Sequence, residues 1–204
     1  MIISDIQRMK RLFTIAAALL FLVGCKQSDN QSVDMNPDFL KIATDRYSVR
    51  SFSSTPVAQD TIDLILRAGQ VAPTAVNSQP QKIYVVKSEE KMALLNEASP
   101  CMYGAPHCFV VCYTDANAVK RGEGTYGEID ATIVLTHMTL EAASLGIGSC
   151  IVGYFDEGKV RSALRIPDSV HPVLLLPFGY ASPDARPSDR HASYRDLTET
   201  VEYR

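Results

Sequence analysis

The 204-residue sequence contains no tryptophan, only four histidines and no excess of basic residues. Its 20 lysines and arginines are outnumbered by 23 acidic residues, which gives a formal net charge of −3. Proteins that bind nucleic acid usually present a basic face, and this charge balance gives no reason to expect one. The histidines form no His-x-x-x-His pair, and the cysteines lack zinc-like spacing. We therefore predict neither a nucleic-acid partner nor a metal.

The sequence also lacks an apolar run at its start that is long enough to span a bilayer. The run from Leu12 to Val23 has about twelve residues, whereas a hydrocarbon core of ~30 Å needs roughly 20. It follows Met9-Lys10-Arg11 and ends in Leu22-Val23-Gly24-Cys25. Basic residues, a short apolar segment and a small residue before a cysteine are typical of a bacterial lipoprotein signal. A buried N-terminal helix and an uncleaved anchor are the alternatives.

The lipoprotein interpretation divides the chain into three parts. Residues 1–24 are expected to be a signal peptide, with translation starting at either Met1 or Met9. Cys25 is expected to carry the lipid, so the mature protein would work in the cell envelope. Lys26 stands where an aspartate would signal retention at the inner membrane, which favours the outer membrane. Residues 25–35 are polar and predict a flexible tether, and residues 36–204 are expected to form one domain.

Four cysteines remain beyond the lipidation site. Cys108 and Cys112 lie in the apolar stretch Cys-Phe-Val-Val-Cys, which reads as one buried strand. Four residues along a strand cover ~13 Å, which is too far for a disulfide. We expect free and mostly buried thiols at Cys101, Cys108, Cys112 and Cys150.

Hydrophobic periodicity predicts helices and strands intermixed along residues 36–204. Helices are expected over residues 36–44, 58–71, 89–97, 126–145 and, after a cap at Asp156, as far as residue 164. Strands are expected over residues 82–86, 108–114, 149–152 and 173–178, with a loop over residues 46–52. Regular βαβ units are missing, so we expect an α+β domain. The helix over 126–145 is apolar nearly all round and should be covered on several sides.

One glycine-rich segment has the form of a nucleotide-binding motif. Gly122-Glu123-Gly124-Thr125-Tyr126-Gly127 fits Gly-x-Gly-x-x-Gly and precedes a helix. A dinucleotide fingerprint must directly follow a strand inside a βαβ unit, and the preceding strand is expected to end near Thr114. We therefore interpret this segment as a flexible loop.

The segment Arg46-Tyr47-Ser48-Val49-Arg50 is the first candidate for binding chemistry. Alternate side chains of an extended loop point the same way, so Arg46, Ser48 and Arg50 can converge on one anion. Guanidinium groups are well suited to a two-pronged grip on phosphate. A solvated surface loop is the alternative for this segment taken alone.

Three further segments are rich in small, polar or turn-forming residues. They are Ala72–Pro80, Leu145–Gly153, and Gly179-Tyr180 followed by Arg186-Pro187-Ser188-Asp189-Arg190. Each one singly is compatible with ordinary turns and strand ends.

Taken together, in this order and spacing, the four segments resemble the nitroreductase family of FMN-dependent oxidoreductases. The resemblance runs from about Asn36 to the C-terminus. It implies a nitroreductase-like α+β fold, in which helices flank a central mixed or antiparallel sheet, and a homodimer that binds FMN. It also implies two-electron transfer from NAD(P)H, or another donor in the envelope, to a small electron-poor acceptor such as a nitroaromatic or a quinone.

The resemblance assigns the phosphate of FMN to two parts of the chain. Arg46, Ser48 and Arg50 would hold it, with Tyr47 between them, and Arg186 and Arg190 would complete the grip. Tyr47, Tyr103 and Tyr126 can line the pocket, although buried core positions are the favoured interpretation for these three.

Two other segments are assigned to the flavin ring. Ile151, Val152 and Gly153 would run along it, with the Gly153 amide near the nitrogen that accepts hydride. A loop from the partner subunit would lie against it through Pro73, Thr74, Ala75 and Asn77. No catalytic side chain is assigned, because the flavin itself carries the chemistry.

Two features depart from the family pattern. Gln81 stands where many members have tryptophan, and residues 115–124 are too short for the lid that longer insertions build over the flavin. These differences concern substrate preference rather than the flavin site. The alternative functions are a related dehalogenase-like or flavin-modifying enzyme, and a lipoprotein that binds flavin without turnover.

Overall fold

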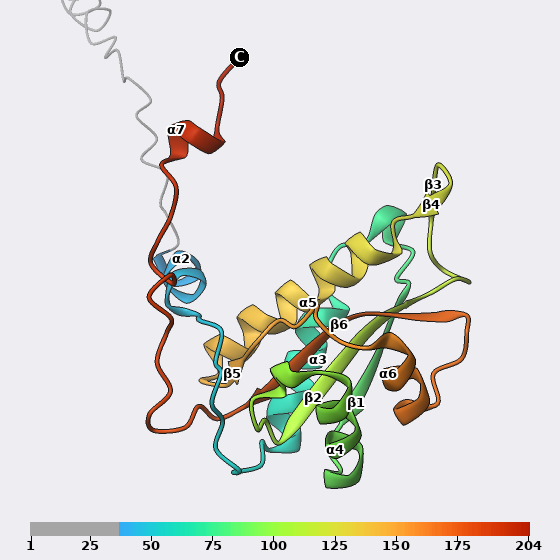
Figure 1. Ribbon diagram of the computed structural model, residues 1–204. Coiled ribbons are helices and arrows are strands. Elements are labelled where there is room, and N and C mark those ends of the chain that lie inside the picture. The colour runs from blue at the N-terminus through green and yellow to red at the C-terminus, as the bar shows by residue number, and fades with distance from the viewer. Residues whose placement is uncertain (1–36) are drawn as a thin grey trace, which may run out of the picture. The chain divides into compact units, whose positions relative to one another are not determined.

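A computed structural model of the chain describes residues 37–204 (Figure 1). The expected signal peptide, the lipidation site at Cys25 and the tether lie outside the described residues. Within residues 37–204, no helix is both long and apolar enough to cross a membrane. The helical elements are α2 (Pro37–Asp45), α3 (Gln59–Gln70), η1 (Ala75–Asn77), α4 (Glu89–Ala98), η2 (Pro100–Met102), α5 (Gly127–Ser144), α6 (Glu157–Leu164) and α7 (Leu197–Thr200). The strands are β1 (Gln81–Val86), β2 (His107–Thr114), β3 (Lys120–Arg121), β4 (Gly124–Thr125), β5 (Gly148–Ser149) and β6 (Val170–Gly179).

The main sheet has four strands in the order β1-β2-β6-β5, and every neighbouring pair is antiparallel. The register shifts between Val111 and Cys112 of β2, where Pro172 of β6 lies opposite. Proline cannot donate to the ladder, so a bulge is a position where a sheet tolerates it. The predicted α+β domain is confirmed, and of the two sheet arrangements expected, mixed or antiparallel, the structure has the antiparallel one.

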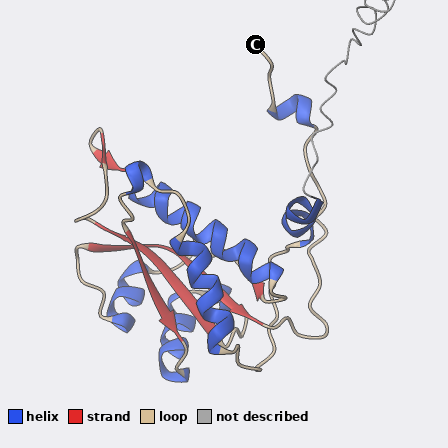
Figure 2. Cartoon of the chain, turned by 180° about the vertical axis from the view of Figure 1, so that it is seen from behind, coloured by secondary structure: helices blue, strands red, loops and turns tan. Residues whose placement is uncertain are grey.

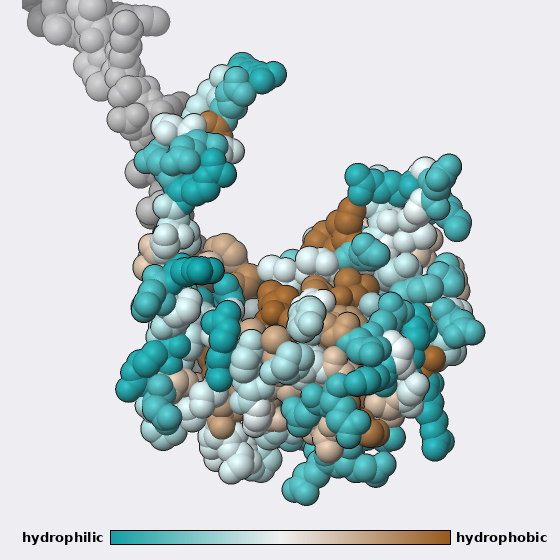
Figure 3. Space-filling view, in the orientation of Figure 1, coloured by the Kyte–Doolittle hydropathy of each residue, from teal (hydrophilic) through white to brown (hydrophobic). Residues whose placement is uncertain are grey.

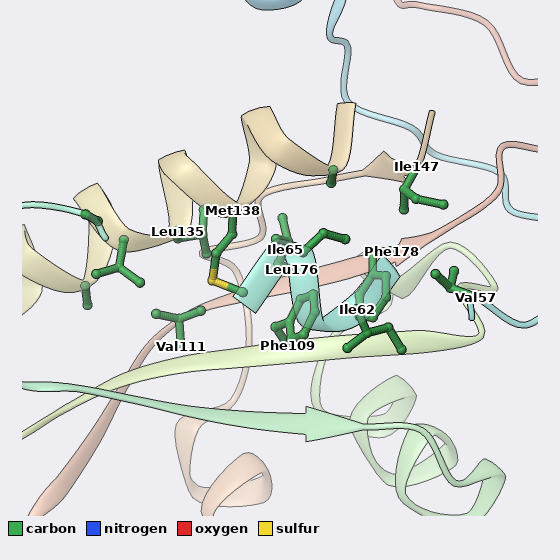
Figure 4. Close-up of a cluster of buried hydrophobic side chains, with 14 residues drawn as sticks. Val57, Ile62, Ile65, Phe109, Val111, Leu135, Met138, Ile147, Leu176 and Phe178 are labelled. Carbon is green, nitrogen blue, oxygen red and sulfur yellow. The ribbon is translucent and has the colours of Figure 1, made fainter. Parts of the chain in front are cut away.

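Helices cover both faces of this sheet (Figure 2), and each face has its own apolar core. Phe109 and Val111 of β2 point to the core under α3 and α5. There the Phe109 ring stacks on the Phe178 ring, with 4.2 Å between the ring centroids (Figure 4). Val110 and its neighbours of the other parity point to the core under α4 and α6. Because both faces are buried, β2 reads as a continuous apolar run rather than an alternating one.

The helix caps explain where two of the helices begin. The side chain of Ser88 accepts a hydrogen bond from the Lys91 amide at the start of α4, and Asp156 accepts one from the Lys159 amide at the start of α6. Both contacts satisfy amides that the first turn leaves unpaired. The predicted cap at Asp156 is confirmed.

Three expectations from the sequence need correction. The strand predicted over 149–152 is shorter, because β5 contains only Gly148–Ser149, and Val152 makes an isolated bridge to Leu175. The strand predicted over 173–178 is longer, since β6 continues through its two prolines. The glycine-rich segment, expected to be a flexible loop, forms the turn and the second strand of a β3–β4 hairpin that pairs with no other described strand. The Arg121 guanidinium lies over the Tyr126 ring. The tail includes the short helix α7.

Candidate functional site

Three segments that are far apart in the sequence meet beside β5, at the edge of the sheet. The Val49 amide donates to the Ser149 carbonyl at 3.0 Å, and Ser48 bridges Ser149 in parallel. On the other side, the Ser53 amide donates to the Tyr180 carbonyl at 2.8 Å. We call residues 46–53, 148–153 and 179–182 together the edge site.

Polar side chains gather at the edge site. Ser48 is half-buried and Arg50 is exposed, with Nη1 of Arg50 donating to the Ser48 carbonyl at 3.3 Å. Burial raises the pKa of the Cys150 thiol, while the nearby Arg50 and a hydrogen bond with Ser48 oppose this rise. A hydrogen bond with Cys101 raises the pKa of Tyr103, and Arg50 opposes that rise as well. Arg50 therefore lies beside Ser48, Cys150 and Tyr103, and its charge is not paired with any described carboxylate.

A cavity of about 410 Å³ adjoins the edge site between α2 and the end of α5. Lys41, Arg46 and Tyr47 line its polar part, and Val49 and Ile147 line part of its apolar wall. Tyr103 and Tyr126 are half-buried and do not line this cavity.

The residues expected along the flavin ring divide between inside and outside. Val152 is buried, and its amide and carbonyl both pair with Leu175 at 2.9 Å. Ile151 and Gly153 are exposed on either side of it. Among the described residues, the Gly153 amide has no acceptor. The segment thus presents a free backbone donor next to an exposed apolar side chain.

The C-terminal tail returns toward the first arginine segment. The His191 ring lies edge-on to the Tyr47 ring, with 6.2 Å between centroids. Arg190 precedes it and is exposed. The Arg186 guanidinium instead donates to the carbonyls of Pro183 and Ala185. The fold therefore brings the neighbourhood of Arg190 to the edge site. The Arg186 guanidinium, in contrast, bonds carbonyls of its own turn and does not reach the edge site through any described contact.

The segment with Pro73, Thr74, Ala75 and Asn77 lies elsewhere. The Ala75 amide donates to Oδ1 of Asp130, in the first turn of α5, at 3.0 Å. The edge site lies at the opposite end of this helix, beyond Ser144. Fourteen residues of helix rise about 21 Å. One chain therefore does not bring this segment and the edge site together.

The thiols and metal ligands can be compared with the expectations. All four cysteines among residues 37–204 are free, and only Cys101 is not fully buried, which confirms that prediction. Among these residues, no three His, Cys, Asp or Glu side chains are placed to hold a metal ion.

Sequence reasoning missed two contributors near these segments. The sequence predicts only a core thiol at Cys150, yet the structure places this thiol beside Arg50 and Ser48. Asp130 was not singled out, although a carboxylate facing the core of an otherwise apolar helix is a recognisable signal.

Comparison with known proteins places this arrangement in a family. The sequence model of the nitroreductase family matches residues 43–101 and 95–180. This chain belongs to the nitroreductase family. An FMN reductase [NAD(P)H] of Bacillus subtilis is 30% identical over 176 residues, which cover 76% of this chain and 68% of that protein.

Solved structures show the same fold. A nitroreductase family protein of Clostridium difficile superimposes with a TM-score of 0.75 and 32% identity, covering 80% of this chain and 96% of that chain. A Bacteroides fragilis nitroreductase with bound FMN has a TM-score of 0.69 and 22% identity, over 81% of this chain and 99% of that chain. The expected nitroreductase-like fold is confirmed.

Proposed function

We propose that this nitroreductase family member is a lipid-anchored homodimer that transfers two electrons from a reduced nicotinamide, or another envelope donor, to an electron-poor acceptor such as a nitroaromatic or a quinone. The chain is an FMN-dependent oxidoreductase of the nitroreductase type. The observation that carries the proposal is the edge site, where the arginine segment, the 148–153 segment and the end of β6 are hydrogen-bonded together.

The residues of the edge site fit the phosphate of FMN. Arg46, Ser48 and Arg50 stand on one short segment whose neighbour Val49 is fixed to β5 by a backbone hydrogen bond. Arg50 is exposed and free of a described carboxylate, so its charge is available to a dianion. Arg190 can join from the tail, which contacts Tyr47 through His191. Charged donors on a fixed backbone bind phosphate strongly because little ordering is needed when it arrives.

The 151–153 segment fits the edge of a flat ring. Ile151 offers an exposed apolar side chain and Gly153 offers an amide with no acceptor in the described chain. The pairing of Val152 with Leu175 holds both in place. FMN supplies the two-electron chemistry when bound, and the protein supplies its position and surroundings. No side chain at the edge site is needed to give or take a proton.

The two ends of α5 support a homodimer. The edge site lies beyond one end of this helix, and the 73–77 segment is pinned to the other. If two copies of α5 pack antiparallel across a two-fold axis, each 73–77 segment lies over the partner's edge site. Figure 3 shows apolar atoms gathered along α5, and Ile129 on this helix is 40% exposed. Tyr194, Leu197 and Tyr203 of the tail are also exposed, which suits a segment that wraps around a partner.

The position of the protein in the cell follows from the proposed lipid on Cys25. An anchor in the outer membrane would hold the domain on a polar tether. NADH and NADPH are cytoplasmic cofactors. We therefore propose that another electron donor in the envelope can take their place.

The proposal is tested by comparing FMN with riboflavin, which lacks the phosphate. Arg50→Ala and Arg190→Ala should each weaken FMN about tenfold or more, because a hydrogen bond to a charged group contributes ~1.5–3 kcal/mol. Both variants should bind riboflavin as the parent protein does. Arg67→Ala, on the exposed side of α3, is the matched control and should change neither affinity. Unchanged FMN affinity in Arg50→Ala and Arg190→Ala would contradict the phosphate assignment.

A further inference from the structure

Residues 73–80, which we call the 73–80 loop, include three non-glycine residues with positive φ angles. Val76, Asn77 and Gln79 have φ angles of 47°, 57° and 48°. Residues other than glycine rarely adopt this left-handed region, and a β-branched valine does so least readily. The side chain of Val76 is nevertheless 87% exposed, so packing of the loop tip does not hold this conformation.

Hydrogen bonds from within and behind the loop hold it instead. Thr74 accepts from the Gln79 amide through Oγ1 at 3.0 Å and from the Asn77 amide through its carbonyl at 2.9 Å. The Ala75 amide donates to Oδ1 of Asp130 at 3.0 Å. This is the only side-chain hydrogen bond that ties the described part of the loop to α5.

The frame behind the loop is rigid. The Thr114 amide of β2 donates to the Pro80 carbonyl at 2.8 Å and so fixes the end of the loop. The start is tied to α5 through Asp130, and α5 itself packs closely on β2. A Cβ placed at Gly127 would lie 2.4 Å from the Tyr113 ring, so only glycine permits this approach. Both ties of the loop are therefore locked together before any ligand arrives.

The carboxylate of Asp130 is itself unusual. The residue is only 2% exposed, and its second oxygen, Oδ2, is buried without a hydrogen-bond partner among the described residues. Burying an incompletely paired carboxylate is costly, so a residue in this place needs a compensating role. Its position in the first turn, where the helix dipole favours negative charge, offsets part of the cost.

We propose that Asp130 is a positioning residue, which holds the 73–80 loop in its left-handed conformation through Ala75 and so presents Asn77 to the flavin of the partner subunit. The inference rests on the proposed function. Asp130 touches neither substrate nor cofactor and acts through the loop alone. The loop is therefore preformed, and the flavin does not have to order it.

Three variants in the whole chain test this. Asp130→Leu removes the acceptor and keeps the same branched arrangement of side-chain heavy atoms, although the two methyl groups are bulkier than the carboxylate oxygens, and Asp130→Asn keeps an oxygen for the Ala75 amide. Thr139→Val is the matched control, because Thr139 is also buried on α5 and its hydroxyl donates only to the Leu135 carbonyl. Hydrogen exchange of the FMN-free proteins reports the loop directly, through the bonded amides of Ala75, Asn77 and Gln79.

Asp130→Leu should lose protection at these amides, alter the visible spectrum of bound FMN and weaken FMN about tenfold. Asp130→Asn should restore protection and affinity to within about threefold, and Thr139→Val should match the parent in all three readouts. The inference is overturned if Asp130→Leu keeps the parent's protection and flavin spectrum, or if Thr139→Val loses them equally. If the parent protein itself binds no FMN, the proposed function fails instead, while the exchange result still decides whether Asp130 holds the loop.

Discussion

Gly148→Ala should separate the segment Arg46–Arg50 from β5 and so disable the edge site. A Cβ at this position would lie 2.7 Å from Cγ2 of Val49, 3.2 Å from Cβ of Val49 and 3.3 Å from the Gly179 carbonyl oxygen. Val49 is 2% exposed and β-branched, so it has few other rotamers to adopt. Forcing an extra methyl group into a well-packed site costs about 1–3 kcal/mol.

This cost predicts two measurable changes. For a domain of this size, about 1 kcal/mol lowers the Tm by roughly 2–4 °C, so a decrease of about 2–12 °C is expected in thermal unfolding. If the displaced segment loses about 1.4 kcal/mol of its interaction with FMN, fluorescence titration should show a tenfold weaker affinity. Adding Val49→Ala removes the closest clash and should recover part of the FMN affinity.

A second glycine provides the control. A Cβ at Gly124 would meet only the Arg121 carbonyl oxygen, at 3.8 Å, so Gly124→Ala should leave FMN affinity unchanged. If Gly148→Ala lowers the Tm but binds FMN as tightly as the parent, the contact between Val49 and β5 does not build the flavin site, and our reasoning is refuted.

Three further predictions concern other parts of the chain. Burial is the main cause that lowers the pKa of His107, and the charge of Lys87 lowers it further. Nε2 of His107 accepts a hydrogen bond from the Val57 amide at 3.2 Å. The unfolded chain therefore binds the proton more readily, and stability should fall as pH drops below about 6.5; His107→Gln should flatten the Tm profile in that window, and an unchanged slope would assign it to other groups. Cys25→Ala should leave a larger, unprocessed species that no longer carries lipid, whereas a size and membrane fractionation equal to the parent's would refute the lipoprotein interpretation. Deleting Ser193–Arg204 should lower dimer content and FMN occupancy together in light scattering, and a truncated monomer with full FMN would show that each site is built within one chain.

The elements with clear periodicity could be predicted from the sequence. The stretch from Cys108 to Thr114 reads as a buried strand because both faces of β2 are covered, and Ser88 and Asp156 announce the helices that they cap. The predicted ends of β5 and β6 are wrong because the strands they pair with determine where each strand begins and ends. Strand β6 tolerates Pro172 at a bulge, and nothing local reveals where that bulge falls.

The candidate site was predictable only through its pattern as a set. No local signal shows that Ser48 bridges Ser149 or that Ser53 pairs with Tyr180, because those contacts join segments about a hundred residues apart or more. The family resemblance supplied the grouping, and the structure supplies the contacts. Asp130 was missed because its importance comes from a backbone amide of another segment, which a sequence pattern does not display.

The most direct test of the central claim is the visible spectrum of the protein comprising residues 26–204, recorded without oxygen. Our account predicts that the purified protein carries FMN, that NADH or NADPH bleaches the flavin band, and that a quinone or a nitroaromatic then restores it with two electrons per flavin. The account is contradicted if the protein binds FMN but the flavin is not reduced by NADH, NADPH or a chemical reductant and is not reoxidised by these acceptors. That result would favour a flavin-binding lipoprotein without turnover.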